Sequence, residues 1–262
     1  MENWGRWWRG GLVLLLGCCL CWTGRAIAAE TLSDRLASYP NWQHKPTTQL
    51  AQGDLAYPDW MAGDWQLATT LIDMVAPLAP TITTPGFESN RDYLNQPMRF
   101  PVRFYSANLP QPRRLVPQHN RTGVIADRAF NGQQIAKAYL GDNLVQAVKV
   151  DPANPNRQIT ILKGNRQLES TISDRATEQP NATQFITTEL FQQVFRGTEQ
   201  PYLNQVETTT SYVYRPEQPE QPIVADQVTA IYLSPNDPQY FQAGENPVAL
   251  YRYKLEFSPL QK

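Results

Sequence analysis

The sequence predicts an all-β protein whose successive antiparallel strands form a sandwich or a barrel. Three observations predict this class. Segments rich in Val, Ile, Thr, Tyr and Phe recur from residue 64 to residue 258, and the 22 prolines fall mostly between them. Several segments alternate with a period of two, as where Val206, Thr208 and Tyr212 share one face. Many strands in succession, joined by short turn-rich links, are typical of antiparallel β architectures.

Nine segments are expected to be strands, and the domain is expected to hold nine or ten. "KGNR" (163–166) and "DPANPN" (151–156) carry the residues that reverse a chain between strands. Pro101 lacks a backbone N–H and therefore predicts an edge or a bulge within its strand. The expected strands cover residues 64–75, 98–106, 143–151, 157–163, 166–173, 184–196, 204–215, 224–234 and 247–258.

One segment, residues 126–142, is expected to form a single short helix. Asp127 is a suitable N-cap, Gly141 stands where a helix ends, and Ala, Gln and Lys between them favour helix over strand. Asn131 and Gly132 favour the alternative, a hairpin, because this dipeptide is a common two-residue turn.

The first 28 residues are expected to be a signal peptide. Arg6 and Arg9 give a basic start, residues 12–22 are apolar but too short to span a bilayer, and residues 26–28 supply small residues for cleavage. Residues 29–59 are polar with scattered proline and are expected to be a tether, with a short helix at "TLSDRLASY". The β domain is expected over residues 60–262.

The leader also contains an alternative cleavage site. "LLGC" (15–18) resembles the lipobox of bacterial lipoproteins, which would anchor the chain at Cys18. Either route predicts an exported protein. Cleavage before Ala29 would leave no cysteine and a formal charge of about −3, because three arginines and one glutamate are removed. No basic surface for nucleic acid is expected, nor is any cysteine-ligated metal. All three cysteines lie in the leader: Cys18, Cys19 and Cys21.

Catalysis has few candidate residues in this sequence. His44 and His119 are the only histidines, and they lack metal-ligand spacing. No nucleotide or phosphate-binding motif appears. Glu207 and Asp226, on consecutive expected strands, are the carboxylate pair that best suits acid and base work, although charged residues on a sheet are more often solvated. No cofactor and no metal are expected. The sequence favours a protein without enzymatic activity.

"AGDWQLATTLIDM" resembles the first strand of lipocalins, which opens with a Gly-x-Trp triplet. The resemblance implies a calycin-type barrel in which Gly63 allows a sharp entry, Trp65 closes one end and Arg252 of the last strand stacks on the indole. A small apolar ligand is then expected inside the barrel. Six aromatic residues are the expected cavity contacts: Phe100, Phe104, Phe185, Tyr212, Tyr232 and Tyr251.

From about Tyr57 onward the chain resembles an uncharacterised family of exported cyanobacterial proteins with plastid relatives. "ADRAFNGQQIAKAYLGD", "DPANPNRQITIL", "FITTELFQQVFRG" and "ADQVTAIYLSPNDPQYF" carry the resemblance. It implies a thylakoid lumen or a periplasm as destination and transfers no catalytic residue. The expected function is the binding or carrying of a lipid, pigment or quinone. The alternative is an assembly or stability factor that contacts a photosynthetic membrane complex through Pro-rich loops at residues 77–97 and 216–222.

Overall fold

The computed structural model describes residues 30–109, 121–197 and 201–260. Residues 31–262 form one compact unit. The expected signal peptide, Cys18 and His119 lie outside the described residues. In the described part, no helix is long and apolar enough to cross a bilayer.

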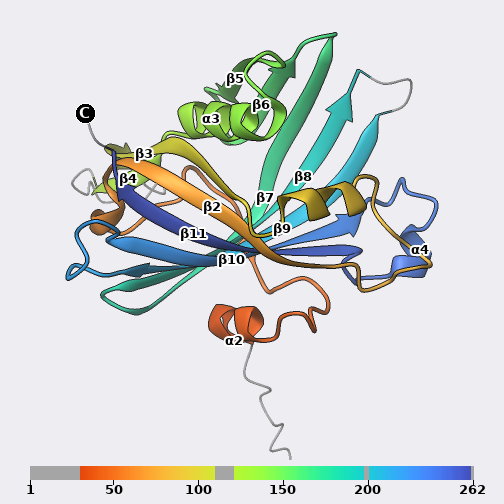
Figure 1. Ribbon diagram of the computed structural model, residues 1–262, viewed down its shortest axis with the longest axis horizontal. Helices are drawn as coiled ribbons and strands as arrows, with labels where there is room; N and C mark the ends of the chain where they lie inside the picture. The colour runs from red at the N-terminus through yellow and green to blue at the C-terminus, as the bar shows by residue number, and fades with distance from the viewer. Residues whose placement is uncertain (1–29, 110–120, 198–200, 261–262) are drawn as a thin grey trace, which may run out of the picture. The chain divides into compact units, whose positions relative to one another are not determined.

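A single antiparallel sheet of eleven strands makes up most of the described chain (Figure 1). Ten strands follow the order β4-β3-β2-β11-β10-β9-β8-β7-β6-β5, and β1 pairs separately with β7. The strands are β1 (Gln49–Leu50), β2 (Gly63–Val75), β3 (Pro97–Leu109), β4 (Arg121–Ala126), β5 (Val145–Asp151), β6 (Asn154–Leu162), β7 (Arg166–Asn181), β8 (Gln184–Arg196), β9 (Tyr202–Tyr214), β10 (Ile223–Leu233) and β11 (Ala249–Pro259).

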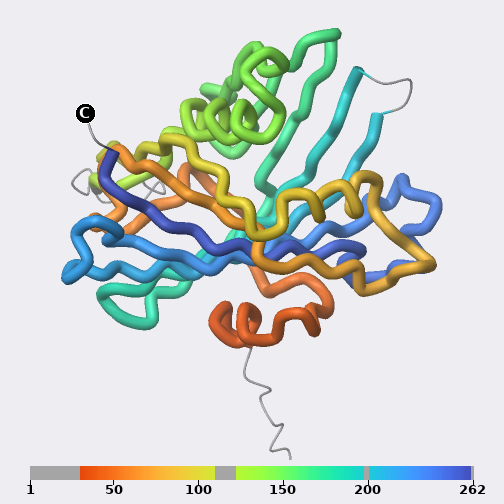
Figure 2. Tube along the Cα trace, in the orientation of Figure 1, coloured from red at the N-terminus to blue at the C-terminus, as the bar shows by residue number. Residues whose placement is uncertain are grey.

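The sheet curls into a barrel-like shape, as the Cα trace in Figure 2 shows. The expected all-β, antiparallel, lipocalin-like class is therefore confirmed. Each of the nine expected segments contains a strand, because period-2 alternation and turn residues are local signals. The strands β1 and β4 were not expected, because they are short and β4 carries Gly123 in its interior.

The turns also agree with the sequence. Gly164 and Asn165 of the β6–β7 hairpin have left-handed φ angles of 78° and 57°. Between β5 and β6, the Asp151 carboxylate accepts a hydrogen bond from the Ala153 N–H at 2.9 Å. Pro101 pairs with Gln66 of β2 in the part of β3 that lies beyond the pairing with β4, as expected for an edge position.

Helix α3 (Arg128–Leu140) packs against both margins of the curled sheet, touching β3 on one side and β5 and β6 on the other (Figure 1). The helix prediction is confirmed, with the Asp127 carboxylate accepting from the Phe130 N–H at 3.1 Å and Gly141 as the C-cap. Asn131, which favoured a hairpin, bonds the edge of β3 through its side chain. Gly132 lies so close to Gln158 of β6 that a Cβ atom would come within 2.7 Å of its amide.

The inner face of the sheet holds the largest apolar cluster. Trp65, Phe104, Phe185, Tyr212 and Phe257 belong to it. The Phe185 and Tyr212 rings stack at 6.4 Å between centroids. This face alternates with an outer face along every strand, since successive side chains point to opposite sides.

The outer face is covered by the segment before β1. Helix α2 (Leu32–Ala37) contacts β8 and β9, and Leu32, Leu36 and Trp42 pack on apolar residues of the sheet such as Val228 and Leu250. Residues 31–50 therefore belong to the folded unit, and the expectation of a polar tether is corrected for them. The polar composition of these residues predicted a tether, but two leucines and one tryptophan are enough to pack the segment on the sheet.

Short helical segments complete the fold: the 3-10 helices η1 (Asp59–Met61) and η2 (Glu88–Tyr93) and the helix α4 (Tyr240–Ala243). The loop leading into η2 covers the inner face through Ile82 and Phe87, which are 2% and 3% exposed. Within the Pro-rich loop over residues 77–97, Ile82, Thr84 and Phe87 are thus part of the core, whereas most of the loop is exposed.

Candidate functional site

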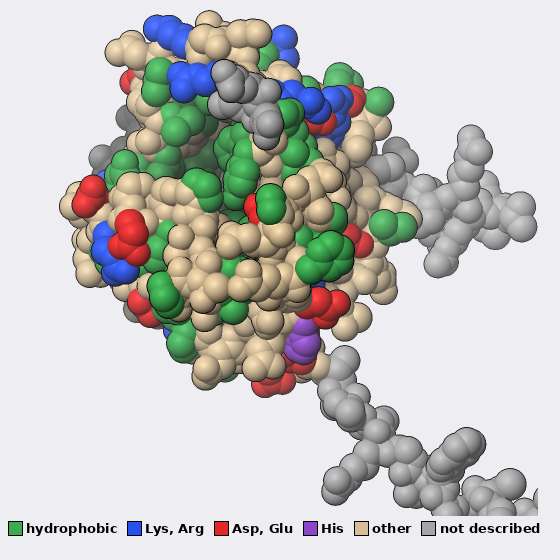
Figure 3. All heavy atoms as spheres, turned by 90° about the vertical axis from the view of Figure 1, so that its right-hand side faces the viewer, with side chains coloured by type: hydrophobic (Ala, Val, Ile, Leu, Met, Phe, Trp, Pro, Cys, Tyr) green, Lys and Arg blue, Asp and Glu red, His purple; other side chains and the backbone are tan. Residues whose placement is uncertain are grey.

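A pocket of about 370 Å³ opens on the inner face, at the end of the sheet where β8 ends and β9 begins. This volume lies within the range of small-molecule sites. The space-filling view of this side of the molecule shows a hollow bordered by hydrophobic side chains (Figure 3). The residues around the pocket are Thr84, Pro85, Asn90, Phe195, Tyr202, Asn204, Ile231 and Tyr251.

Aromatic rings form much of the pocket wall. Phe195 and Tyr202 lie with ring centroids 5.9 Å apart, and Phe87 supports Tyr251 from behind at 5.8 Å. The side chain of Phe195 is 37% exposed, unlike the other inner-face phenylalanines. Such a wall is suited to the flat surface of an apolar ligand.

The pocket's polar groups are neutral. The Asn90 amide donates to the Tyr251 hydroxyl at 3.1 Å, which positions that ring. Burial raises the pKa of both Tyr202 and Tyr251, so neither phenol is ionised near neutral pH. No acidic or basic residue of the described chain lines this pocket. A charged ligand would therefore meet no opposite charge in the wall.

The other end of the barrel is filled by side chains. Towards α3, the space lined by Thr69, Leu71, Tyr139 and Tyr253 amounts to only about 10 Å³. Beyond it, Phe104, Phe185 and Tyr212 are each at most 8% exposed within the apolar core. The barrel is thus packed at one end and has a pocket at the other.

The six aromatic residues expected around one cavity are distributed over three places. Tyr251 lines the pocket. Tyr232 lies on the outer face, in a polar network under residues 31–50. The remaining four belong to the packed core: Phe100, Phe104, Phe185 and Tyr212. Sequence patterns did not show on which face of the sheet, or at which end of the barrel, each of these residues lies, so they could not separate the three locations.

Trp65 belongs to the packed core, but Arg252 does not contact it. The indole is 9% exposed and donates to the Met61 carbonyl at 2.9 Å. Gly63 has a φ of 141° and lies against that indole. Arg252 is opposite Asp73, far along β2 and on the outer face, where it bonds Asp226 at 2.7 Å and lies over the Tyr39 ring. The expected arginine lid on Trp65 is therefore wrong.

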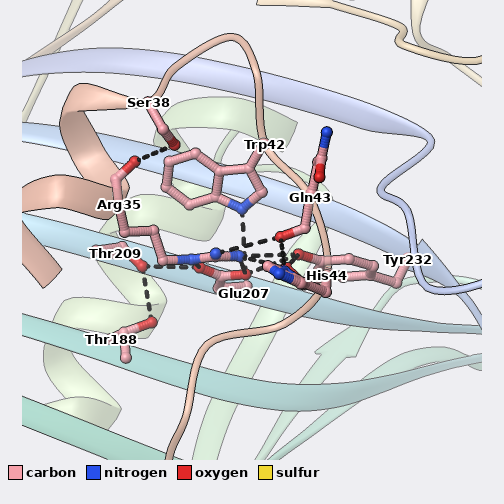
Figure 4. A network of polar contacts seen from close by, with 9 residues as sticks. All are labelled: Arg35, Ser38, Trp42, Gln43, His44, Thr188, Glu207, Thr209 and Tyr232. Carbon is pink, nitrogen blue, oxygen red and sulfur yellow. Dashed lines mark hydrogen bonds and ion pairs between the residues drawn. The ribbon is translucent and has the colours of Figure 1, made fainter. Parts of the chain in front are cut away.

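A buried network of polar side chains on the outer face was not expected from the sequence (Figure 4). Glu207 of β9 is fully buried, and its two oxygens accept from Arg35 Nε at 2.6 Å and Nη2 at 2.8 Å. The Tyr232 hydroxyl donates to Glu207 at 2.8 Å and the Trp42 indole at 3.3 Å. Thr209 is a further donor at 3.0 Å.

Arg35 is fixed as firmly as its partner. Its guanidinium is 2% exposed, donates to the His44 carbonyl at 2.7 Å and lies 4.3 Å from the Trp42 ring centroid. Burial and the Glu207 carboxylate raise the pKa of the Tyr232 phenol, which stays protonated as a donor. The network therefore fixes the segment of residues 31–50 against the outer face of the sheet.

Glu207 and Asp226 do not form the acid–base pair considered from the sequence. Their strands are neighbours, but Asp226 is opposite Ser211, four residues along β9 from Glu207, or about 13 Å at the usual rise per residue. Each carboxylate has its own arginine, Arg35 or Arg252. Among the described residues, no cluster of three or more His, Cys, Asp or Glu is arranged to hold a metal.

Sequence reasoning missed most of the pocket. Asn204 lies in phase with Val206 and Tyr212, so a polar residue at an inner position was the available signal. Phe195 lies within an expected strand and Tyr202 lies just before the next one, and neither position carries a local signal of a pocket. Thr84 and Pro85 come from a loop and Asn90 from η2, and only the fold determines the path of this segment.

Comparison with known protein families places the chain in one of them. Residues 49–261 match the family described as Domain of unknown function (DUF6816). The chain belongs to this family. No curated protein and no solved structure matches the chain.

The match to the DUF6816 domain begins at Gln49, the first residue of β1. It includes every strand of the sheet and the whole pocket wall. Helix α2 and Arg35 precede it, so the partner of the buried Glu207 comes from outside the matched residues.

Proposed function

We propose that this DUF6816 protein binds or carries a small apolar molecule, such as a lipid, a pigment or a quinone, in the pocket at the open end of its curled sheet. The observation that carries the proposal is the pocket of about 370 Å³ with aromatic walls on the inner face, in a sheet whose other end is packed. Such a concave, mostly apolar site with few polar groups is the usual form of a small-molecule site.

Binding rather than catalysis is proposed because the two carboxylates considered for acid and base work are engaged elsewhere. Glu207 and Asp226 face away from the pocket in ion pairs, and the pocket itself presents amides, hydroxyls and rings. The basic start, apolar segment and small-residue site in residues 1–28 support export, with the thylakoid lumen or periplasm as the proposed location.

The proposal is tested with the purified protein and an uncharged fluorescent probe, N-phenyl-1-naphthylamine. The probe should brighten on binding, and Ile231→Trp, which fills the pocket, should weaken binding by at least about tenfold. Gln205→Trp is the matched control, because Gln205 lies on the same sheet but on its outer face, and it should bind as the wild type does. Organic extracts of the protein from a photosynthetic host should contain a stoichiometric apolar compound by mass spectrometry.

Two results would remove the proposal. One is a wild-type protein that neither binds the probe nor yields an extractable compound. The other is equal weakening by Ile231→Trp and Gln205→Trp, which would place the probe outside the pocket. A membrane complex recovered by pull-down, with no pocket ligand, would favour the alternative of an assembly factor, for which the exposed parts of the loops at residues 77–97 and 216–222 offer a surface.

A further inference from the structure

The amide oxygen of Asn204 is the one uncompensated polar atom in the pocket wall of the described chain. The side chain is 8% exposed, and its Oδ1 has no hydrogen-bond partner within the described residues. Buried acceptors in native proteins almost always have a partner, because leaving one unsatisfied is unfavourable. The position is an inner one on β9, opposite Leu233 of β10 and Gln193 of β8.

The polar groups next to Asn204 Oδ1 make other contacts and form no hydrogen bond with this oxygen. The Tyr251 hydroxyl accepts from the Asn90 amide at 3.1 Å. The side chain of Asn204 also contacts the Tyr202 phenol, and this contact lowers the pKa of Tyr202 against the larger, opposite effect of burial. The amide oxygen therefore remains as an acceptor for a donor brought by another molecule.

The rest of the wall defines what carries that donor. Phe195 and Tyr202, 5.9 Å apart, present ring surfaces, and Ile231 and Pro85 add aliphatic contacts. No described acidic or basic residue lines the pocket, and an ion transferred there would lose its hydration without gaining a partner. The ligand body should thus be apolar, ring-shaped and uncharged.

We propose that the pocket selects uncharged ring compounds that carry a hydroxyl or N–H group, and that this group donates a hydrogen bond to Asn204 Oδ1. The inference rests on the proposed ligand-binding function and assigns Asn204 as its specificity-determining residue. We expect the pocket to prefer a ring with a hydroxyl group over the same ring with that oxygen methylated, because methylation removes the hydrogen-bond donor.

The test compares three probes by isothermal titration calorimetry with the full protein. These are 1-naphthol, 1-methoxynaphthalene, which has the same rings without a donor, and 1-naphthoate, which is charged at neutral pH. Wild type should bind 1-naphthol about tenfold more tightly than 1-methoxynaphthalene. It should bind 1-naphthoate more weakly than 1-naphthol by at least a similar factor.

Asn204→Leu removes the acceptor and keeps a side chain of similar size. It should bind 1-naphthol and 1-methoxynaphthalene with affinities within about twofold of each other. Gln205→Leu, a matched change at the next position of β9 on the outer face, should keep the tenfold preference. If Asn204→Leu does not fold, the wild-type comparison of the first two probes decides alone.

The outcomes separate this inference from the function on which it rests. Equal binding of 1-naphthol and 1-methoxynaphthalene by the wild type overturns the role of Asn204 but leaves the pocket as a ligand site. A preference that persists in a folded Asn204→Leu protein also overturns it. Failure of every probe to bind removes the proposed function as well.

Discussion

At the scale of single residues, the Arg35–Glu207 pair is the most consequential contact in the structure. A fully buried carboxylate is tolerated because a bidentate arginine, a phenol and an indole all donate to it. Since Arg35 comes from a segment that lies across the outer face, the pair couples the position of that segment to the sheet. A buried pair of this kind adds little net stability, but losing one member is costly.

We predict that Arg35→Met lowers the free energy of unfolding by about 3–5 kcal/mol, because Glu207 is left buried without its countercharge. Urea denaturation measures the change. The double variant Arg35→Met, Glu207→Leu should regain much of the loss. The control is Arg157→Met at the ion pair with Glu169, where the arginine side chain is 38% exposed and the loss should be much smaller than for Arg35→Met. A loss below about 1 kcal/mol for Arg35→Met would contradict the prediction.

At the scale of elements, helix α3 completes the barrel where strand pairing does not. The edge strands β4 and β5 do not pair with each other, and open edges invite association with other chains. The Asn131 side chain forms the two hydrogen bonds to β3 that a neighbouring strand would form. Its amide accepts from the Arg103 N–H at 2.8 Å and donates to the Arg103 carbonyl at 3.0 Å. The Arg103 guanidinium also lies 3.8 Å from the Phe130 ring centroid.

We predict that Asn131→Ala lowers the free energy of unfolding by about 1–3 kcal/mol, although alanine is the better helix former. The reason is that the Arg103 N–H loses its partner, while the Arg103 carbonyl keeps only the bond from the Asp127 N–H at 3.0 Å. Hydrogen exchange at the Arg103 amide, followed by mass spectrometry, should accelerate in parallel. Ile135→Ala on the same helix, where the side chain is 44% exposed, should change stability by less than about 1 kcal/mol. Unchanged exchange at Arg103 would count against this role of Asn131.

At the scale of the whole molecule, buried tyrosines link stability to alkaline pH. Burial raises the pKa of Tyr57, of Tyr232 and of Tyr253, and raises that of Tyr212 to about 12. A raised folded-state pKa means that the native state holds its proton more tightly than the unfolded chain, whose tyrosines titrate near about 10. The stabilisation from these phenols is therefore complete below about pH 10 and is lost as the pH rises through the folded values.

We predict that these phenols ionise only as the sheet unfolds. Tyrosinate absorbance and far-ultraviolet circular dichroism, followed together from about pH 9 upward, should change in one shared transition for the buried set. The same chain in concentrated urea is the reference and should titrate near about pH 10 without that transition. Ionisation of all tyrosines near pH 10 with the circular dichroism unchanged would refute the prediction.

The elements were largely predictable, whereas the site was not. The nine expected strands, the helix between Asp127 and Gly141 and the α2 helix each depend on neighbours within a few residues, and the structure contains all of them. The pocket wall brings together Asn204, Phe195 and Tyr251 of three strands and Asn90 of the 3-10 helix η2. No local pattern brings these four together.

By itself, the sequence determined the all-β class, the strand positions, the capped helix and the alternation of faces along β9, because periodicity and turn chemistry act over short distances along the chain. Only the tertiary structure decided that a helix covers the open margins of the sheet, that Arg252 lies on the face opposite Trp65, and that Glu207 is buried. The partners Arg35 and Glu207 are 172 positions apart. Their contact depends on strand register and on the path of a covering segment, which are fixed by the packing of the whole sheet rather than by any stretch of sequence.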